Sequence, residues 1–144
     1  KLSECFGRDI YHNGRLNRGL LSSRVFGKSD KIVLLNSIVH PVVRFDFYRW
    51  SESLNEEICF VESAILYESR FDELVDEVWT VTAPEELRIG RVRQRSGLTE
   101  EEIKKRMAAQ LSEEEKQRRA AHIIWNDGNV SVIHRVLSLL KSLE

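Results

Sequence analysis

Two patterns in the 144-residue sequence predict an α/β domain. Short, solid apolar runs, typical of strands buried on both faces of a parallel sheet, occur three times, at residues 58–61, 77–82 and 122–125. Stretches with helical spacing of apolar residues lie before, between and after them. Strands that alternate with helices indicate βαβ units and a parallel sheet, and the length fits one compact domain.

Composition narrows the class of protein. The chain is 42% hydrophobic and 31% charged, which is typical of a globular protein rather than a disordered or fibrous one. Its 22 basic and 23 acidic residues give a net charge of −1, so no overall field favours nucleic acid or an anionic membrane as partner. No apolar run approaches the roughly 20 residues of a membrane-spanning helix, and no signal-peptide pattern opens the chain. We therefore expect a cytoplasmic protein with no membrane or nucleic-acid partner.

The two cysteines, Cys5 and Cys59, are far apart and form no CxxC motif, which predicts buried free thiols. The sequence starts at Lys1 rather than at a methionine, and we expect it to be part of a longer protein.

The first 56 residues are expected to be helical. Asn13-Gly14 predicts a tight turn because both residues tolerate positive φ. A helix then runs to Phe26-Gly27, and Ser29 is placed to cap the next one. Pro41 is expected to open a third helix that extends to about Leu54.

Residues 85–119 differ in chemistry, because 18 of these 35 positions are charged, ten of them Lys or Arg and eight Glu. Pro84-Glu85 and the pairs Thr99/Glu102 and Ser112/Glu115 are helix-start signals that predict three short helices in series, without a core of their own. The arginines suit phosphate binding, since the planar guanidinium pairs with phosphate oxygens. A solvated face of ion pairs such as Glu101–Lys105 and Glu102–Arg106 is the alternative.

Ligands of parallel sheets bind beyond the carboxyl ends of the strands, where Glu62, Thr82-Ala83 and Asn126 are expected. Glu62 either orients a metal or a substrate hydroxyl, or only caps a turn. Asn126-Asp127-Gly128 either approaches a purine edge or is a simple turn before the final helix, residues 130–143, whose apolar face should cover the sheet. The histidines lack metal-ligand spacing, and no HExxH, Ser-His-Asp order, Rossmann fingerprint, EF-hand or phosphate loop (GxxxxGKS or GxxxxGKT) occurs.

Seven segments, in order and spacing, resemble the dephospho-coenzyme A kinase family of P-loop kinases over essentially the whole chain. They are Asn13-Gly14-Arg15-Leu16-Asn17-Arg18 with Val25-Phe26, Ile38-Val39-His40-Pro41-Val42-Val43, Ile65-Leu66-Tyr67-Glu68, Thr82-Ala83-Pro84-Glu85-Glu86, Arg91 to Arg95, Arg106-Met107-Ala108-Ala109-Gln110-Leu111 and Ile124-Trp125-Asn126-Asp127-Gly128. The resemblance implies a P-loop kinase-type parallel sheet flanked by helices, with a helical lid, and ATP-dependent, Mg²⁺-dependent phosphorylation of the ribose 3′-hydroxyl of dephospho-coenzyme A. It divides the chain into a helical substrate-binding region (1–56), the sheet core (57–84 and 120–144) and the lid (85–119).

The resemblance also implies roles for single residues. Arg106 is expected to be catalytic, contacting the ATP phosphates from the lid, with Arg91 as a second contact at the lid base; Asn126 and Gly128 should lie by the adenine. The expected substrate-binding residues for dephospho-coenzyme A are His40, Glu62, Tyr67 and Glu68. Arg93, Arg118 and Arg119 remain surface charge, and no metal ligand is assigned to these residues.

Two departures from the family pattern matter. Glu62-Ser63-Ala64 replaces the usual aspartate and proline of the D-x-P-L-L segment. The family's N-terminal part, with the phosphate loop, the metal-binding Ser or Thr and the base, has no counterpart in the sequence, so this chain alone is expected to be inactive. The family's first strand lies between the strands that end here at Glu62 and Thr82. Without it, those strands should stand roughly 9 to 10 Å apart or pair directly.

Two other hypotheses stay open. Residues 85–119 could form a non-catalytic helical module that binds RNA or protein, although no aromatic residue lies between Arg88 and Arg119 to stack on bases. The chain could also be a structural remnant with no activity.

Overall fold

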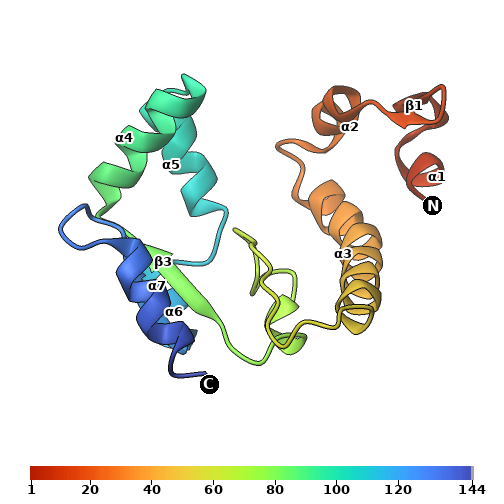
Figure 1. Ribbon diagram of the computed structural model, residues 1–144. Helices are drawn as coiled ribbons and strands as arrows, with labels where there is room; N and C mark the ends of the chain where they lie inside the picture. Colours follow the sequence, from red (N-terminus) through yellow and green to blue (C-terminus); the bar gives the residue numbers. More distant parts are fainter. Residues whose placement is uncertain (144) are drawn as a thin grey trace. The chain divides into compact units, whose positions relative to one another are not determined.

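The computed structural model describes residues 1–143, which form two compact units, Lys1–Val61 and a second one from Glu62 onward. The first unit holds helix α1 (Leu2–Phe6), a 3₁₀ turn (Arg8–Ile10), strands β1 (Tyr11–His12) and β2 (Arg15–Leu16), and helices α2 (Arg18–Val25) and α3 (Ser29–Glu52). The second holds a 3₁₀ turn (Phe71–Glu73), strands β3 (Trp79–Thr82) and β4 (His122–Trp125), and helices α4 (Glu85–Ser96), α5 (Glu100–Ala108), α6 (Glu113–Arg119) and α7 (Val132–Leu140), as Figure 1 shows.

The predicted turn of the first unit is present. β1 and β2 form an antiparallel hairpin around Asn13-Gly14, whose φ angles are 49° and 74°. The core of this unit consists of Phe6, Ile10, Leu21 and Val25, against which Leu34, Leu35 and Ile38 of α3 pack. Four buried side chains from α1, the 3₁₀ turn and α2 therefore attach one side of α3 to the hairpin region.

Helix α3 corrects two predictions. It is one continuous helix through Pro41, and Ser29 is its first residue rather than its cap, because Lys28 holds the cap position without a side-chain bond. Proline removes one backbone hydrogen bond and strains the preceding turn. The remaining bonds of a 24-residue helix outweigh that single loss, so the helix does not stop there.

The second unit is built on a two-stranded parallel sheet. β3 and β4 pair in parallel from Trp79↔His122 to Thr82↔Trp125, which confirms two of the three predicted strands and the α/β class. Two residues of β3, Thr80 and Thr82, form hydrogen bonds with α6. Thr80 Oγ1 donates to the Lys116 carbonyl (3.4 Å), and Gln117 Nε2 donates to Thr82 Oγ1 (3.3 Å).

The prediction of a strand at residues 58–61 is wrong. This segment forms no strand, and Ile58 and Phe60 are exposed. Cys59 and Cys5 are exposed as well, so the prediction of buried thiols is also wrong. A parallel strand is stable only when its backbone groups pair with neighbours. Among residues 1–143, β3 pairs with β4 alone, so the run at 58–61 does not re-pair with β3.

The charged segment is helical as predicted, and its caps follow the sequence. Thr99 and Glu102 form a complete capping box at the start of α5. Ser112 caps α6 through the Glu115 amide, but the Glu115 carboxylate turns to Arg118 and Arg119 instead of returning to the cap. α4 and α5 contact each other (Figure 1), and one side chain of each, Ile89 and Ile103, is buried, so the segment holds two buried apolar side chains.

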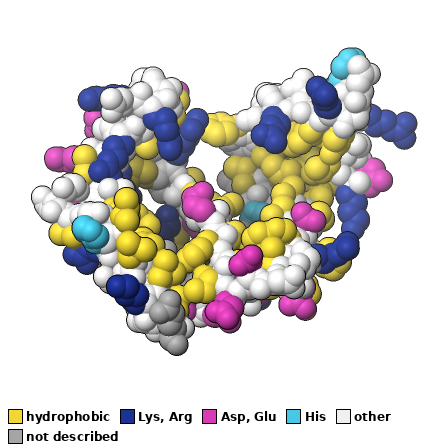
Figure 2. Space-filling view, in the orientation of Figure 1, with side chains coloured by type: hydrophobic (Ala, Val, Ile, Leu, Met, Phe, Trp, Pro, Cys, Tyr) yellow, Lys and Arg dark blue, Asp and Glu magenta, His cyan; other side chains and the backbone are white. Residues whose placement is uncertain are grey.

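Helix α7 packs on β4, as its apolar face predicts, although it is shorter than the predicted 130–143. Much of that face stays uncovered: Ile133 is 70% exposed and Leu137 50%. Figure 2 shows hydrophobic side chains gathered on the visible surface of α7 and, separately, of α3. No helix within residues 1–143 combines the length and apolar character needed to cross a membrane.

Candidate active site

The two strands end level with each other at their carboxyl ends. Thr82 pairs with Trp125, and the next residue, Asn126, donates its backbone N–H to the Thr82 carbonyl at 2.7 Å. From this edge the chain continues through Ala83-Pro84 into α4 and through the turn 126–128 toward α7. Because ligands of parallel sheets bind beyond this end of the strands, the residues here form the candidate site.

Arg91 and Asn126, which are 35 positions apart, meet at this edge. Arg91 Nη1 donates to the Asn126 carbonyl oxygen at 2.8 Å, and Nη2 lies 3.4 Å from its side-chain oxygen Oδ1. Both residues are among those predicted to bind nucleotide. The guanidinium therefore places a positive charge beside the end of β4 and holds α4 there.

The turn after β4 is ordered by its own side chains. The Asp127 carboxylate accepts from the backbone N–H of Asn129 (3.0 Å) and from its side-chain amide (2.9 Å). The bond from the Asn129 backbone lowers the pKa of Asp127, so this carboxyl stays ionised. Gly128 has a φ of 91°, which favours glycine, and a Cβ placed there would meet no atom within 4 Å. The space beside Gly128 is therefore open.

Four of the ten basic side chains of the charged segment are paired with carboxylates. Arg88 meets Glu113 at 2.9 Å, Lys104 meets Glu100 at 2.7 Å, and Arg118 and Arg119 share Glu115. The hypothesis of an ion-paired face thus describes these residues, although the partners differ from the pairs expected from spacing.

Arg106, like Arg93, Arg95 and Lys105, has no carboxylate partner among the described residues. It lies in the last turn of α5, is exposed, and forms no ion pair or hydrogen bond within the described part of the chain. Glu102 is bound to the backbone and hydroxyl of Thr99, which lower its pKa, while Arg106 adds only a weaker charge effect. Its charge is therefore available to an anionic ligand. No hydrogen bond joins Arg106 to Arg91 or Asn126 in the described residues.

Tyr67 and Glu68 contact the charged segment at both ends of α6. Glu68 Oε1 accepts the backbone N–H of Leu111 at 2.6 Å, just before α6. The Arg119 guanidinium lies 5.3 Å from the centre of the Tyr67 ring, at the end of α6. Burial raises the pKa of Tyr67, whose hydroxyl has no hydrogen-bond partner within residues 1–143.

The other two predicted site residues are Glu62 and His40. Glu62 is exposed and forms no ion pair or hydrogen bond within residues 1–143. His40 is half-buried in α3, in the first unit.

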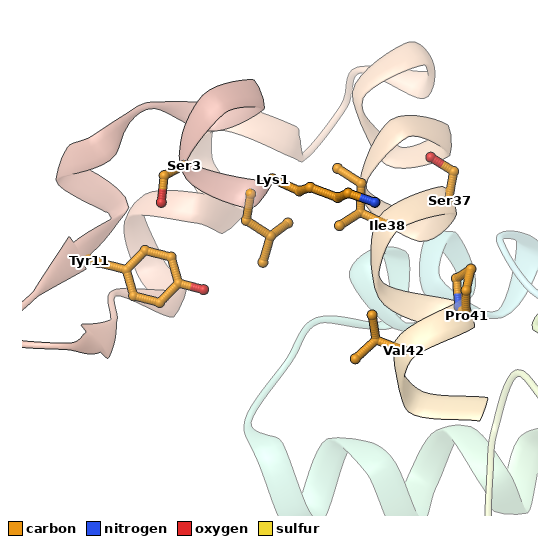
Figure 3. A pocket seen from close by; sticks show the side chains of 8 residues that line it. Lys1, Ser3, Tyr11, Ser37, Ile38, Pro41 and Val42 are labelled. Atoms are coloured by element: carbon orange, nitrogen blue, oxygen red, sulfur yellow. The ribbon is translucent and has the colours of Figure 1, made fainter. Parts of the chain in front are cut away.

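A cavity of about 480 Å³ also lies in the first unit, where Figure 3 shows the side chains that surround it. It is lined by Lys1, Leu2, Ser3, Tyr11, Ser37, Ile38, Pro41 and Val42. It neighbours His40 in sequence but does not include it, so no predicted site residue lines this cavity.

The residues that bind Glu68 and Arg88 were not predicted from the sequence. Leu111 binds Glu68 through its backbone amide, and Glu113 binds Arg88 across 25 positions. A backbone amide carries no side-chain signal, and Glu113 sits among similar glutamates. Among residues 1–143, no group of three or more His, Cys, Asp or Glu side chains is arranged to hold a metal ion.

A parallel strand pair flanked by helices, with an arginine and an asparagine joined at its carboxyl edge, defines an α/β protein whose candidate site offers positive charge to an anionic ligand. The family model described as dephospho-CoA kinase matches residues 1–131, and the chain belongs to this family.

Relatives and solved structures agree with this assignment. The chain is 38% identical over 144 residues to a dephospho-CoA kinase of Bacteroides fragilis, covering 99% of this chain and 70% of that protein. It is 36% identical over 140 residues to one of Corynebacterium diphtheriae, covering 94% and 70%. A crystal structure of a Thermus thermophilus protein matches with a TM-score of 0.83 and 33% identity over 98% of this chain and 73% of that one. A dephospho-CoA kinase from Campylobacter jejuni matches with a TM-score of 0.66 and 25% identity over 99% and 76%.

Proposed function

We propose that this chain belongs to an enzyme that transfers the γ-phosphoryl group of ATP to the ribose 3′-hydroxyl of dephospho-coenzyme A. The observation that carries the proposal is the match of residues 1–131 to the dephospho-CoA kinase family, and the contact between Arg91 and Asn126 at the carboxyl edge of the sheet supports it. In the reaction the ribose oxygen attacks the γ-phosphorus, the bond to the bridging oxygen breaks, ADP leaves, and the hydroxyl proton passes to a base. That base is not among the residues assigned here.

On the ATP side, Asn126 and Gly128 bind the adenine and Arg91 binds at the lid base. The open surface at Gly128 accommodates a planar ring, and the amide of Asn126 can both donate and accept hydrogen bonds. Because Arg91 already donates to Asn126, it fixes the orientation of that residue as well as supplying charge. One contact of Arg91 thus serves both to orient Asn126 and to place positive charge at the site.

In the lid, Arg106 is the proposed catalytic residue. Charge builds up on the oxygens of the transferring phosphoryl group, and a guanidinium can bind two of them at once. Arg106 is exposed and has no carboxylate partner within residues 1–143, unlike Arg88, Arg118 and Arg119. Arg93, Arg95 and Lys105 are exposed and unpaired in the same way, so the choice of Arg106 among them rests on the resemblance of residues 106–111 to the family pattern. This assigns residues 85–119 to the lid and residues 57–84 and 120–144 to the nucleotide-binding core.

On the acceptor side, the proposed substrate-binding residues are His40, Glu62 and Tyr67, with residues 1–56 as the helical substrate-binding region, and Glu68 is the fourth residue expected there from the sequence. Glu62 carries a charge without a described partner, which leaves it available to a hydroxyl group. Of the four, Glu68 is already bound by the Leu111 amide.

The described residues do not fit a Mg²⁺ site of their own, since no cluster of acidic ligands is present among residues 1–143. ATP is normally bound with Mg²⁺, and its ligands would have to come from elsewhere. The phosphate-loop pattern is also absent from the 144-residue sequence. We therefore expect these residues alone to be inactive, because positioning and charge neutralisation of the phosphates provide most of the rate enhancement in phosphoryl transfer.

The test compares the 144-residue chain with the product of the complete gene, using ADP release coupled to a spectrophotometric readout. The complete product should release ADP only when dephospho-coenzyme A is present, and the 144-residue chain should not. Turnover with a different nucleoside or nucleotide, but none with dephospho-coenzyme A, would overturn the proposed substrate. Salt-sensitive RNA binding without any turnover would favour an interaction module instead.

A further inference from the structure

We propose that Glu68 is a positioning residue that anchors the junction between α5 and α6 and thereby sets the direction of Arg106. This proposal rests on the proposed function of Arg106 in the lid. It assigns Glu68 a role through the protein backbone rather than through contact with dephospho-coenzyme A.

The first step is the contact itself. Glu68 Oε1 accepts the N–H of Leu111 at 2.6 Å, across 43 positions of sequence. Residues 109–112 connect two helices, and the Leu111 N–H has no partner inside either of them. A carboxylate that accepts a backbone N–H forms one of the stronger protein hydrogen bonds. One oxygen of Glu68 therefore holds the junction at a point where helical bonding does not.

Two hydrogen bonds connect the residues of the junction to the start of α6. Gln110 accepts a bond from the Lys116 ammonium at 3.1 Å, and the Ser112 hydroxyl accepts the Glu115 amide at 3.2 Å. These bonds fold the junction onto the first turns of α6 but tie it to nothing outside residues 110–116. Arg88 of α4 holds Glu113 at the start of α6 (2.9 Å), and Glu68 supplies the outside attachment of the junction itself, so its loss should loosen the junction and leave α6 internally intact.

The residue beside Glu68 holds the other end of α6. The Arg119 guanidinium lies over the Tyr67 ring at 5.3 Å while also pairing with Glu115 at 2.7 Å. A helix of this length rises about 10 Å. Two consecutive residues, Tyr67 and Glu68, thus fix both ends of α6 to the turn that contains them.

The consequence for the lid follows from distance along the chain. Arg106 lies in the last turn of α5, five positions before Leu111. The opposite end of α5 is held by its capping box, and Ile103 is buried. The direction in which Arg106 points therefore depends on how the end of α5 meets the junction, and Glu68 determines that meeting point.

The anchor is tested by hydrogen exchange at the Leu111 amide in the 144-residue chain. Glu68→Ala should speed that exchange at least about 10-fold, and Glu68→Gln, which keeps an acceptor oxygen, by less. Glu114→Gln is the matched control, since Glu114 is exposed on α6 and forms no described hydrogen bond or ion pair within residues 1–143. Equal exchange in the wild type and Glu68→Ala overturns the anchor.

The effect on Arg106 is tested by kinetics in the complete gene product. Glu68→Ala should lower kcat about 10-fold with KM for dephospho-coenzyme A within about 2-fold, and Glu68→Gln should recover part of the loss. The double variant Glu68→Ala/Arg106→Ala should be no slower than Arg106→Ala alone, because both changes remove the same interaction. A raised KM for dephospho-coenzyme A with unchanged kcat, or losses that multiply, overturns the positioning role. Absence of kinase activity in the wild type would reject the proposed function, whereas the anchor is decided by the exchange of Leu111.

Discussion

Arg91 donates two hydrogen bonds to Asn126, one to its backbone carbonyl and one to its side-chain oxygen, and so joins α4 to the residue that ends β4. The backbone N–H of Asn126 is bound at the same time to Thr82 of the neighbouring strand. Asn126 is thus fixed from both sides, by the sheet and by the base of the charged helical segment. α4 is therefore attached directly to the carboxyl edge of the sheet.

Replacing Arg91 with lysine should weaken ATP binding to the complete gene product. A lysine keeps the charge but presents one point donor instead of a planar fork, so it cannot hold both oxygens of Asn126. Because the contact is exposed, we expect a rise in Kd of only about 3- to 10-fold. Isothermal titration with a non-hydrolysable ATP analogue measures it. Arg93→Lys, on the same helix, is the control and should leave Kd unchanged; equal effects of the two substitutions would assign the loss to general charge.

The contact between α4 and α5 should make this pair of helices sensitive to truncation of the buried Ile103. This side chain is 2% exposed, and truncation to alanine leaves a cavity that typically costs about 2 to 4 kcal/mol. Since the loss falls on the α4–α5 pair, amide exchange should accelerate in both helices. Urea unfolding and exchange together check this. Ile133→Ala is the control, because Ile133 is 70% exposed and should change stability by well under 1 kcal/mol.

Local signals made part of this fold predictable. Asn13-Gly14 specifies a tight turn, and Thr99/Glu102 a helix start, because each depends on residues within three positions of each other. The pairing of β3 with β4 followed from two short apolar runs separated by helical segments. These features depend on short-range chemistry that single residues encode.

The wrong predictions concern features that depend on residues far apart in the sequence. Pro41 does not end α3, because the surrounding turns keep their hydrogen bonds. The run at 58–61 has strand composition, but a strand also needs a partner, and composition does not supply one. In the candidate site, the types of Arg91 and Asn126 suggested phosphate and purine chemistry, whereas their mutual contact across 35 positions could only be seen in three dimensions.

Gly7 should be among the least replaceable glycines of the first unit. Its φ of 94° and ψ of 145° lie in a region open essentially to glycine alone. An added Cβ would also lie 2.5 Å from Arg24 Nη1 and 2.7 Å from Asp9 Oδ1, two groups that bind each other. Gly7→Ala should therefore destabilise the protein by about 1 to 3 kcal/mol or more. Thermal unfolding measures the loss.

Gly14→Ala separates backbone strain from crowding. Gly14 has a φ of 74° and no atom within 4 Å of the Cβ position. Alanine there should therefore cost only the strain of a left-handed backbone, roughly 1 kcal/mol. Equal losses for the two variants would show that the Arg24–Asp9 contact yields to the added methyl group.

Glu115 should make stability depend on pH in the acid range. Hydrogen bonds from Arg118 and then Arg119 lower the pKa of its carboxyl from 4.5 to about 2. A carboxyl with a depressed folded-state pKa stabilises the fold fully above its unfolded value, and the contribution is lost as pH falls toward the folded value. The wild type should accordingly lose stability between about pH 4.5 and pH 2, and Glu115→Gln, which cannot ionise, should lose less over that interval. Urea unfolding midpoints at pH 7, 4 and 3 measure the difference. Glu114→Gln, one position earlier and without an arginine partner in the described residues, should follow the wild-type curve; a Glu115→Gln curve parallel to the wild type would mean that the arginine pairs do not persist in solution.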